Sequence, residues 1–192
     1  MVRKSSIALL AALMVALFIP QAQAQNFWGQ GTKSWGVGLQ FSVPTGNLSD
    51  VAGIGFGGFG KFQYGLNDDA MLTGSIGYTY WTNKSQYGVS THASAVPLLV
   101  GAKYNLGKYV TPGFYGLGEV GFYFESWTAA VTYINPFTLQ AETATGTSSE
   151  TEFALCLGVG YQFQNFDVSA KYAIAGDASN IAIGVAYQLP LQ

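Results

Sequence analysis

Residues 153–163 read FALCLGVGYQF, and this stretch decides the fold. Every second residue from Phe153 to Phe163 is large and apolar, whereas the residues between them, among them Cys156 and Gly158, are small or polar. Alternation with a period of two puts the two sets on opposite faces of a β-strand. The stretch therefore predicts a strand with one apolar face and one face of small side chains.

The same alternation recurs along the rest of the chain. It is found in residues 35–43, 54–64, 70–81, 96–106, 114–124, 168–174 and 181–187. The long or polar connections are 44–53, 82–95, 125–151 and 175–180, and the short ones are 65–69, 107–112 and 164–166. Short turns at one end and longer loops at the other are typical of outer-membrane barrels. The sequence predicts an all-β fold: an eight-stranded antiparallel up-and-down transmembrane β-barrel.

Composition excludes several other classes of protein. The 192 residues carry 8 Lys and Arg against 10 Asp and Glu, so the chain is weakly acidic and has no basic patch for nucleic acid. Its single cysteine, Cys156, cannot form a disulfide within the chain and is expected to be a small interior filler. Asp68 and Asp69 are expected to cap a turn rather than bind calcium. We expect no cofactor and no metal.

The N-terminus has the pattern of a secretory signal peptide. Arg3 and Lys4 precede the uncharged apolar stretch 7–19, and Ala22-Gln23-Ala24 is a small-x-small cleavage site. The apolar stretch is shorter than the ~20 residues of a membrane-spanning helix. The predicted organisation is therefore a signal peptide at 1–24 and an outer-membrane β-barrel domain at 25–192.

Two kinds of closed barrel could use the alternating pattern. A secreted lipocalin-like carrier turns its large apolar side chains inward, whereas a membrane barrel turns them to lipid. Only 9% of the residues are charged, too few to solvate a soluble barrel, whose surface usually holds ~25–35%. We therefore expect the apolar face to contact lipid. Aromatic residues near the strand ends are expected to form girdles: Trp35, Tyr80, Trp81, Tyr104, Phe124, Trp127 and Tyr187.

Three further stretches carry a resemblance to a known family. Residues 96–107 read VPLLVGAKYNLG and residues 113–118 read GFYGLG, and 167–172 read DVSAKY. These stretches resemble the OmpA/OmpX-type small outer-membrane β-barrel family, and the resemblance covers most of residues 27–188. It implies a barrel inserted by the barrel-assembly machinery, which reads an aromatic residue at the last strand. In this chain Tyr187 would have to serve, because the sequence ends QLPLQ.

Four charged residues fall on the small-residue face and so are predicted to face the lumen. They are Lys61, Lys103, Glu119 and Lys171. A charge in a narrow lumen must be paired or hydrated. The turn after residue 106 predicts that residue 103 pairs with residue 119, and hence an ion pair between Lys103 and Glu119. Such a network would either fill the interior as a plug or gate a narrow pore.

His92 and Ser94 form an H-x-S element on the lipid-facing parity. The element is similar to that of outer-membrane lipid A deacylases, in which His deprotonates Ser and a carboxylate orients His. No acidic residue lies at a convincing spacing, because Glu119 is predicted to face inward and Glu125 lies in the next loop. An enzyme built on this pair is therefore only an alternative.

The sequence favours a structural or surface-exposed outer-membrane protein with loop-mediated external contacts and a lumen filled by side chains. Its expected location is the outer membrane, and its expected partners are outer-membrane lipids, lipopolysaccharide and the barrel-assembly machinery. No nucleic acid is expected, and the barrel is expected to be a monomer. A gated pore, the lipid A-modifying enzyme and the secreted carrier are the alternatives.

Overall fold

The computed structural model describes residues 27–84, 89–109, 113–134 and 140–191. The predicted signal peptide, residues 1–24, lies outside the described residues. Within the described ranges the strands are β1 (Lys33–Pro44), β2 (Ala52–Gly65), β3 (Ala70–Asn83), β4 (Val89–Asn105), β5 (Phe114–Ile134), β6 (Ala141–Phe163), β7 (Phe166–Ala175) and β8 (Asn180–Leu191). Two short helical turns, α2 (Leu48–Val51) and η1 (Gly176–Ala178), lie in the loops. None of the described helices has the length and apolarity to cross a membrane.

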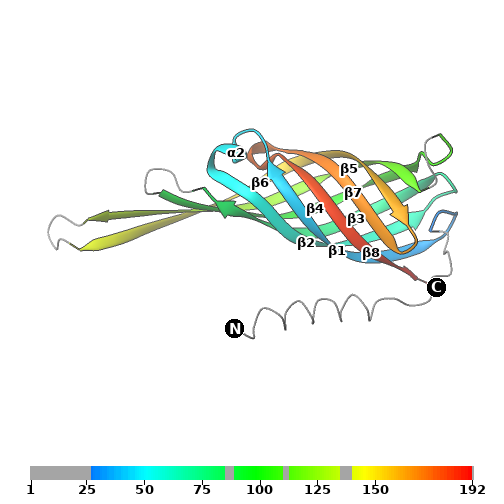
Figure 1. The fold of residues 1–192 in the computed structure, drawn as a ribbon, viewed down its shortest axis with the longest axis horizontal. Helices are drawn as coiled ribbons and strands as arrows, with labels where there is room; N and C mark the ends of the chain where they lie inside the picture. Colours follow the sequence, from blue (N-terminus) through cyan, green and yellow to red (C-terminus); the bar gives the residue numbers. More distant parts are fainter. Residues whose placement is uncertain (1–26, 85–88, 110–112, 135–139, 192) are drawn as a thin grey trace, which may run out of the picture.

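The strands pair in sequence order, and β1 pairs with β8, so the sheet closes into a barrel (Figure 1). Every pairing is antiparallel, which confirms the predicted eight-stranded up-and-down barrel for the described residues. Closure leaves no free edge in the wall and pairs its backbone N–H and C=O groups, as a hydrocarbon surrounding requires.

The large apolar side chains face outward. Leu39 is 74% exposed and Val100 is 60% exposed, whereas interior positions hold small or polar residues. Inward-facing glycines make room for the few large interior rings: a Cβ on Gly38 would lie 2.6 Å from Phe59 Cζ, and one on Gly160 would lie 2.2 Å from the Tyr115 hydroxyl. This orientation is that of a membrane barrel and is opposite to that of the lipocalin-like alternative.

Two predicted loops are largely strand. Residues 125–134 of β5 pair with residues 141–150 of β6, in a continuous register from Glu125↔Glu150 to Ile134↔Ala141. The start of β4 joins them, with Val89 opposite Val131. We call residues 125–134 and 141–150 the ribbon; it projects beyond the barrel at the left of Figure 1. The loop prediction was wrong here because beyond Trp127 no described side chain of the ribbon is buried, and a strand with no buried face carries no alternating signal.

Two of the predicted girdle residues do not face lipid. Trp81 is 1% exposed and belongs to the apolar cluster inside the barrel, and Trp127 packs against that cluster. Trp35, Tyr104 and Phe124 are exposed on the outer face, as the girdle prediction requires. Trp81 and Trp127 have the inward parity of their strands, and parity decides the direction of a side chain more strongly than residue type.

Candidate functional site

The four predicted lumen charges all face the barrel interior. Lys61 is 6% exposed, Lys103 is fully buried and Glu119 is 1% exposed. The Lys171 side chain is 16% exposed. They come from β2, β4, β5 and β7, so the closure of the barrel is what brings them together. Buried charges are costly unless they are paired.

Asp167 of β7 is the centre of this network. Its Oδ2 accepts a short hydrogen bond from Lys103 Nζ and lies 3.7 Å from Lys61 Nζ. Its Oδ1 accepts a short hydrogen bond from the Tyr115 hydroxyl. Lys103 Nζ also lies 4.2 Å from the centroid of the Tyr115 ring. Two amides complete the shell, with donors 3.3 and 3.4 Å from Oδ2: Gln63 and Gln188. One carboxylate therefore compensates two buried ammonium groups.

A second ion pair lies beside the first. Lys171 Nζ is 3.1 Å from Glu119 Oε2, and the Thr73 hydroxyl donates to Glu119 Oε1 at 3.4 Å. The predicted Lys103–Glu119 pair was wrong: Glu119 binds Lys171, and Lys103 binds Asp167. The predicted register was also off by two residues, because Lys103 lies opposite Leu117 and Gly101 lies opposite Glu119.

Sequence reasoning missed Asp167, although a signal for it existed. Asp167, Ser169 and Lys171 share one face of β7, and Lys171 was predicted to face inward. Three lysines with one glutamate leave a large excess of buried positive charge, so a further interior acid was required. Nothing in the local sequence around Tyr115 indicated that its hydroxyl would reach the same carboxylate.

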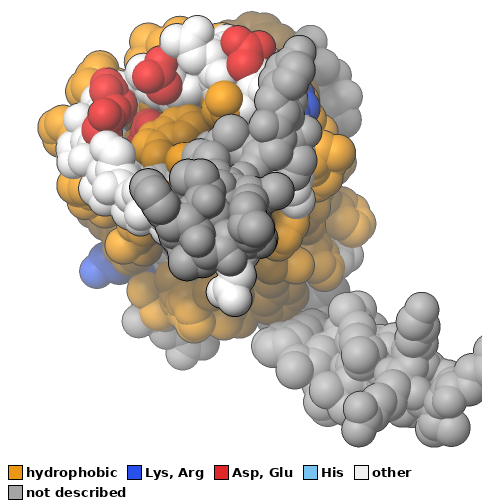
Figure 2. All heavy atoms as spheres, turned by 90° about the vertical axis from the view of Figure 1, so that its left-hand side faces the viewer, with side chains coloured by type: hydrophobic (Ala, Val, Ile, Leu, Met, Phe, Trp, Pro, Cys, Tyr) orange, Lys and Arg blue, Asp and Glu red, His pale blue; other side chains and the backbone are white. Residues whose placement is uncertain are grey.

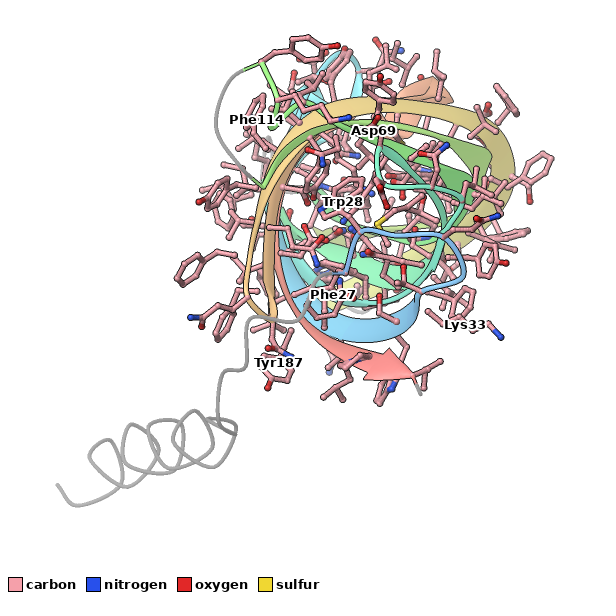
Figure 3. The ribbon with its side chains drawn as sticks, turned by 90° about the vertical axis from the view of Figure 1, so that its right-hand side faces the viewer. Phe27, Trp28, Lys33, Asp69, Phe114 and Tyr187 are labelled. Carbon is pink, nitrogen blue, oxygen red and sulfur yellow. The ribbon has the colours of Figure 1, made fainter. Side chains whose placement is uncertain are left out.

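The ends of the lumen are filled as well. At the short-turn end Phe27 is buried, and the Trp28 ring lies 6.3 Å from the ring of Tyr115 (Figure 3). At the opposite end Leu48 of α2 is fully buried in an apolar cluster with Trp81. A cavity beside Lys61 and Lys171 has a volume of about 20 Å³. That is room for about one water molecule.

Acidic side chains gather on the rim at the ribbon end, around a mouth filled by apolar side chains (Figure 2). Glu125 lies just above Phe124, the last apolar residue that β5 presents to lipid, and is 3% exposed. Burial is the main cause that raises the pKa of Glu125 to about 7. A hydrogen bond from Trp127 Nε1 to Oε2 at 3.2 Å opposes this shift, and the nearby carboxylates of Glu152 and Asp177 add to it. The rim thus holds a carboxyl group that titrates near neutral pH.

The described contacts of His92 do not form the alternative catalytic site. His92 lies on the outer face of β4, and its Nδ1 is 2.8 Å from the Tyr80 hydroxyl, with the two rings stacked. Ser94 lies opposite Tyr80 on β3 and opposite Ser126 on β5. No hydrogen bond between His92 and a carboxylate or Ser94 is found among the described residues. His92 therefore has a hydroxyl partner where a triad needs a carboxylate.

The remaining candidates from the sequence, the turn with Asp69 and the buried Cys156, have contacts typical of structural residues. Asp69 pairs with Lys108 at 2.7 Å, and the Asn67 side chain accepts the backbone N–H groups of Asp69 and Ala70. Cys156 is fully buried inside the barrel. No group of three His, Cys, Asp or Glu residues suited to a metal ion occurs in the described part of the chain.

Residues 8–191 match the model of a family described as the putative MetA-pathway of phenol degradation. The chain belongs to this family. Among curated proteins none matches the chain. The chain is a small outer-membrane β-barrel, as its apolar outer face and closed sheet require.

Solved structures share the barrel. The attachment invasion locus protein Ail of Yersinia pestis is similar, with a TM-score of 0.51 and 17% identity over 84% of this chain and 99% of Ail. Ail in complex with the heparin analogue sucrose octasulfate gives the same TM-score, with 18% identity over 83% of this chain and 99% of Ail. OprG of Pseudomonas aeruginosa gives a TM-score of 0.47, with 10% identity over 85% of this chain and 98% of OprG. At 17–18% identity the likeness to Ail concerns the fold alone.

Proposed function

We propose that this outer-membrane barrel is a non-enzymatic surface protein whose ribbon makes contacts outside the cell. The observation that carries the proposal is the ribbon itself. Its side chains from Thr143 to Glu150 are all exposed, and they are small or acidic. Longer connections of such barrels face outward and short turns face the periplasm. A paired two-stranded extension with no core of its own is suited to presenting a surface.

The lumen network supports a plug rather than a pore. Ion pairs to Asp167 and Glu119 join strands from different sides of the barrel, and apolar side chains fill the interior above and below them. Conduction would need several of these groups to move at once. We therefore propose that Lys61, Lys103, Glu119 and Lys171, with Asp167, have a structural role.

The charge of the ribbon end favours cationic or uncharged partners. Glu125, Glu150 and Asp177 lie at this end, and Glu150 and Asp177 line an open cleft with Trp127. Ail was solved with a sulfated heparin analogue, but the acidic rim here would repel such a polyanion. We expect no binding to heparin at physiological salt.

Ribbon exposure is testable by labelling intact cells with a polyethylene-glycol maleimide too large to cross the outer membrane. A Thr145→Cys variant in the ribbon should be labelled, and an Asp68→Cys variant in a short turn should be labelled only after lysis. The native Cys156 is buried and gives a low background. Labelling of the short-turn variant on intact cells, with the ribbon variant protected, would reverse the proposed orientation.

Single-channel recording in planar bilayers tests the plug. The wild-type protein should show no channels, and the doubly neutralised Lys103→Met, Asp167→Asn variant should show none either, because the apolar cluster still blocks the lumen. A regular conductance in the wild type that changes with this double substitution would establish the gated pore instead. A heat-dependent gel shift checks that both proteins are folded.

Three further expectations follow from the proposal of an exported outer-membrane barrel. We propose residues 1–24 as a cleaved signal peptide, 25–192 as the barrel domain, and Tyr187 as the residue read by the assembly machinery of a monomeric barrel. Handling of phenol, which the family description suggests, is the competing function; it predicts slower growth on phenol when the protein is removed.

The lipid A-modifying enzyme is tested by replacing Ser94 with Ala, which should leave lipid A acylation unchanged.

A further inference from the structure

The lipid-facing wall contains a groove that crosses β1, β2, β3 and β4. Its volume is about 480 Å³, within the ~300–1,000 Å³ range of small-molecule sites. Four strands at a spacing of ~4.8 Å span roughly 14 Å, so the groove is elongated. The outward side chains that line it are Trp35, Val37, Phe62, Ile76, Leu98 and Val100.

Two outward-facing glycines create the groove. Gly60 lies between Val37 and Ile76, and Gly74 lies between Phe62 and Val100. A Cβ on Gly74 would meet nothing within 4 Å, and one on Gly60 would meet only a backbone oxygen at 4.0 Å. Neither glycine has the positive φ that favours this residue. Crowding and backbone geometry therefore do not explain them, in contrast to inward-facing Gly160.

A lysine lies just beyond one end of the groove. Lys33 shares the outward face of β1 with Trp35, two residues or about 7 Å away, and lies opposite Tyr64. Its side chain points away from the barrel at the short-turn end, which is the periplasmic boundary (Figure 3). Lys33 is exposed, and its ammonium makes no ion pair within the described ranges.

We propose that this groove binds one phospholipid from the periplasmic leaflet, with an acyl chain between Gly60 and Gly74 and the phosphate beside Lys33. The groove is continuous with the lipid-facing surface, so hydrocarbon is the material that reaches it. An ammonium group at the membrane boundary complements a phosphate, and Trp35 and Tyr64 suit the interface. The site is independent of whether the lumen conducts.

The test is a titration of the purified, detergent-solubilised protein with palmitoyl-oleoyl-phosphatidylethanolamine, followed by native mass spectrometry. The wild type should bind one phospholipid in a saturable manner. A Cβ at Gly60 or Gly74 makes no close contact, so Gly74→Leu and Gly60→Leu should fill the groove and each raise the apparent Kd by at least about tenfold. Lys33→Gln should raise the apparent Kd about fivefold.

The matched control is Gly118→Leu, which adds the same side chain to the lipid-facing surface of β5. Its Cβ would make an ordinary contact with Leu157 at 3.8 Å, and the residue does not line the groove. Equal weakening in the control and the groove variants would overturn the proposal, as would a wild type that binds no phospholipid. Dimers that disappear in Gly74→Leu would assign the groove to a second copy instead. A heat-dependent gel shift shows that each variant is folded.

Discussion

The barrel wall and the ribbon are two stretches of the same strands, β5 and β6, joined in one unbroken register. Below Phe124 and Thr151 the strands alternate between apolar side chains toward lipid and small side chains toward the lumen. Above them the alternation ends, although the backbone pairing continues. Backbone pairing alone is therefore enough to extend the sheet, whereas contact with lipid on one side and the lumen on the other is what imposes the alternation of side chains.

The largest expected effect comes from the wall's interior. Asp167→Asn leaves Lys103 and Lys61 buried without their counter-charge, which should lower the free energy of unfolding by about 3–5 kcal/mol. The measurement is urea unfolding in phospholipid vesicles. Asp68→Asn, in an exposed turn, is the control and should cost less than about 0.5 kcal/mol. A small loss for Asp167→Asn would mean that the ion pairs do not stabilise the barrel.

The second expected effect is the difference in cost between an arginine in the wall and an arginine in the ribbon, both on the outward face of β6. Leu157 is 58% exposed at the middle of the apolar band, so Leu157→Arg should cost about 2–4 kcal/mol of unfolding free energy. Thr145→Arg, on the same face in the ribbon, should cost less than about 0.5 kcal/mol because its surroundings are water. Urea unfolding in vesicles again measures both. Equal costs at the two positions would contradict the boundary between wall and ribbon.

The same comparison explains which parts of the structure could be predicted from the sequence. The wall strands were predictable because one face of each strand contacts lipid and the other faces a narrow lumen. This difference selects large apolar and small residues in turn, so the sequence alternates with a period of two. The ribbon was not, since beyond Trp127 none of its described side chains is buried on either face. Parity predicted that Lys103 and Glu119 face inward, and both do.

The partners of these charges could not be predicted in the same way. Lys103 reaches Asp167 across the lumen, from β4 to β7, and this depends on the stagger of the closed barrel rather than on local spacing. Trp81 was assigned to the outer girdle by residue type, although its parity already indicated the interior. Missing Asp167 was a failure to balance the interior charge, for which the sequence held the information.

The smallest expected effect concerns Glu125, at the junction of wall and ribbon. Its folded pKa of about 7 lies above the ~4.3 of an unfolded glutamate, so the folded chain binds more protons between these two values. The stability contributed by Glu125 is therefore fully present below pH ~4.3 and is lost as pH rises toward 7. After allowance for solvent screening at the rim, the loss should be about 1–2 kcal/mol. The urea midpoint of the wild type should fall as the pH rises across this range, and it should fall less in Glu125→Gln, which cannot ionise. Identical slopes of midpoint against pH in the two proteins would mean that the folded protein does not raise the pKa of Glu125, and that the rim is as well hydrated as the ribbon.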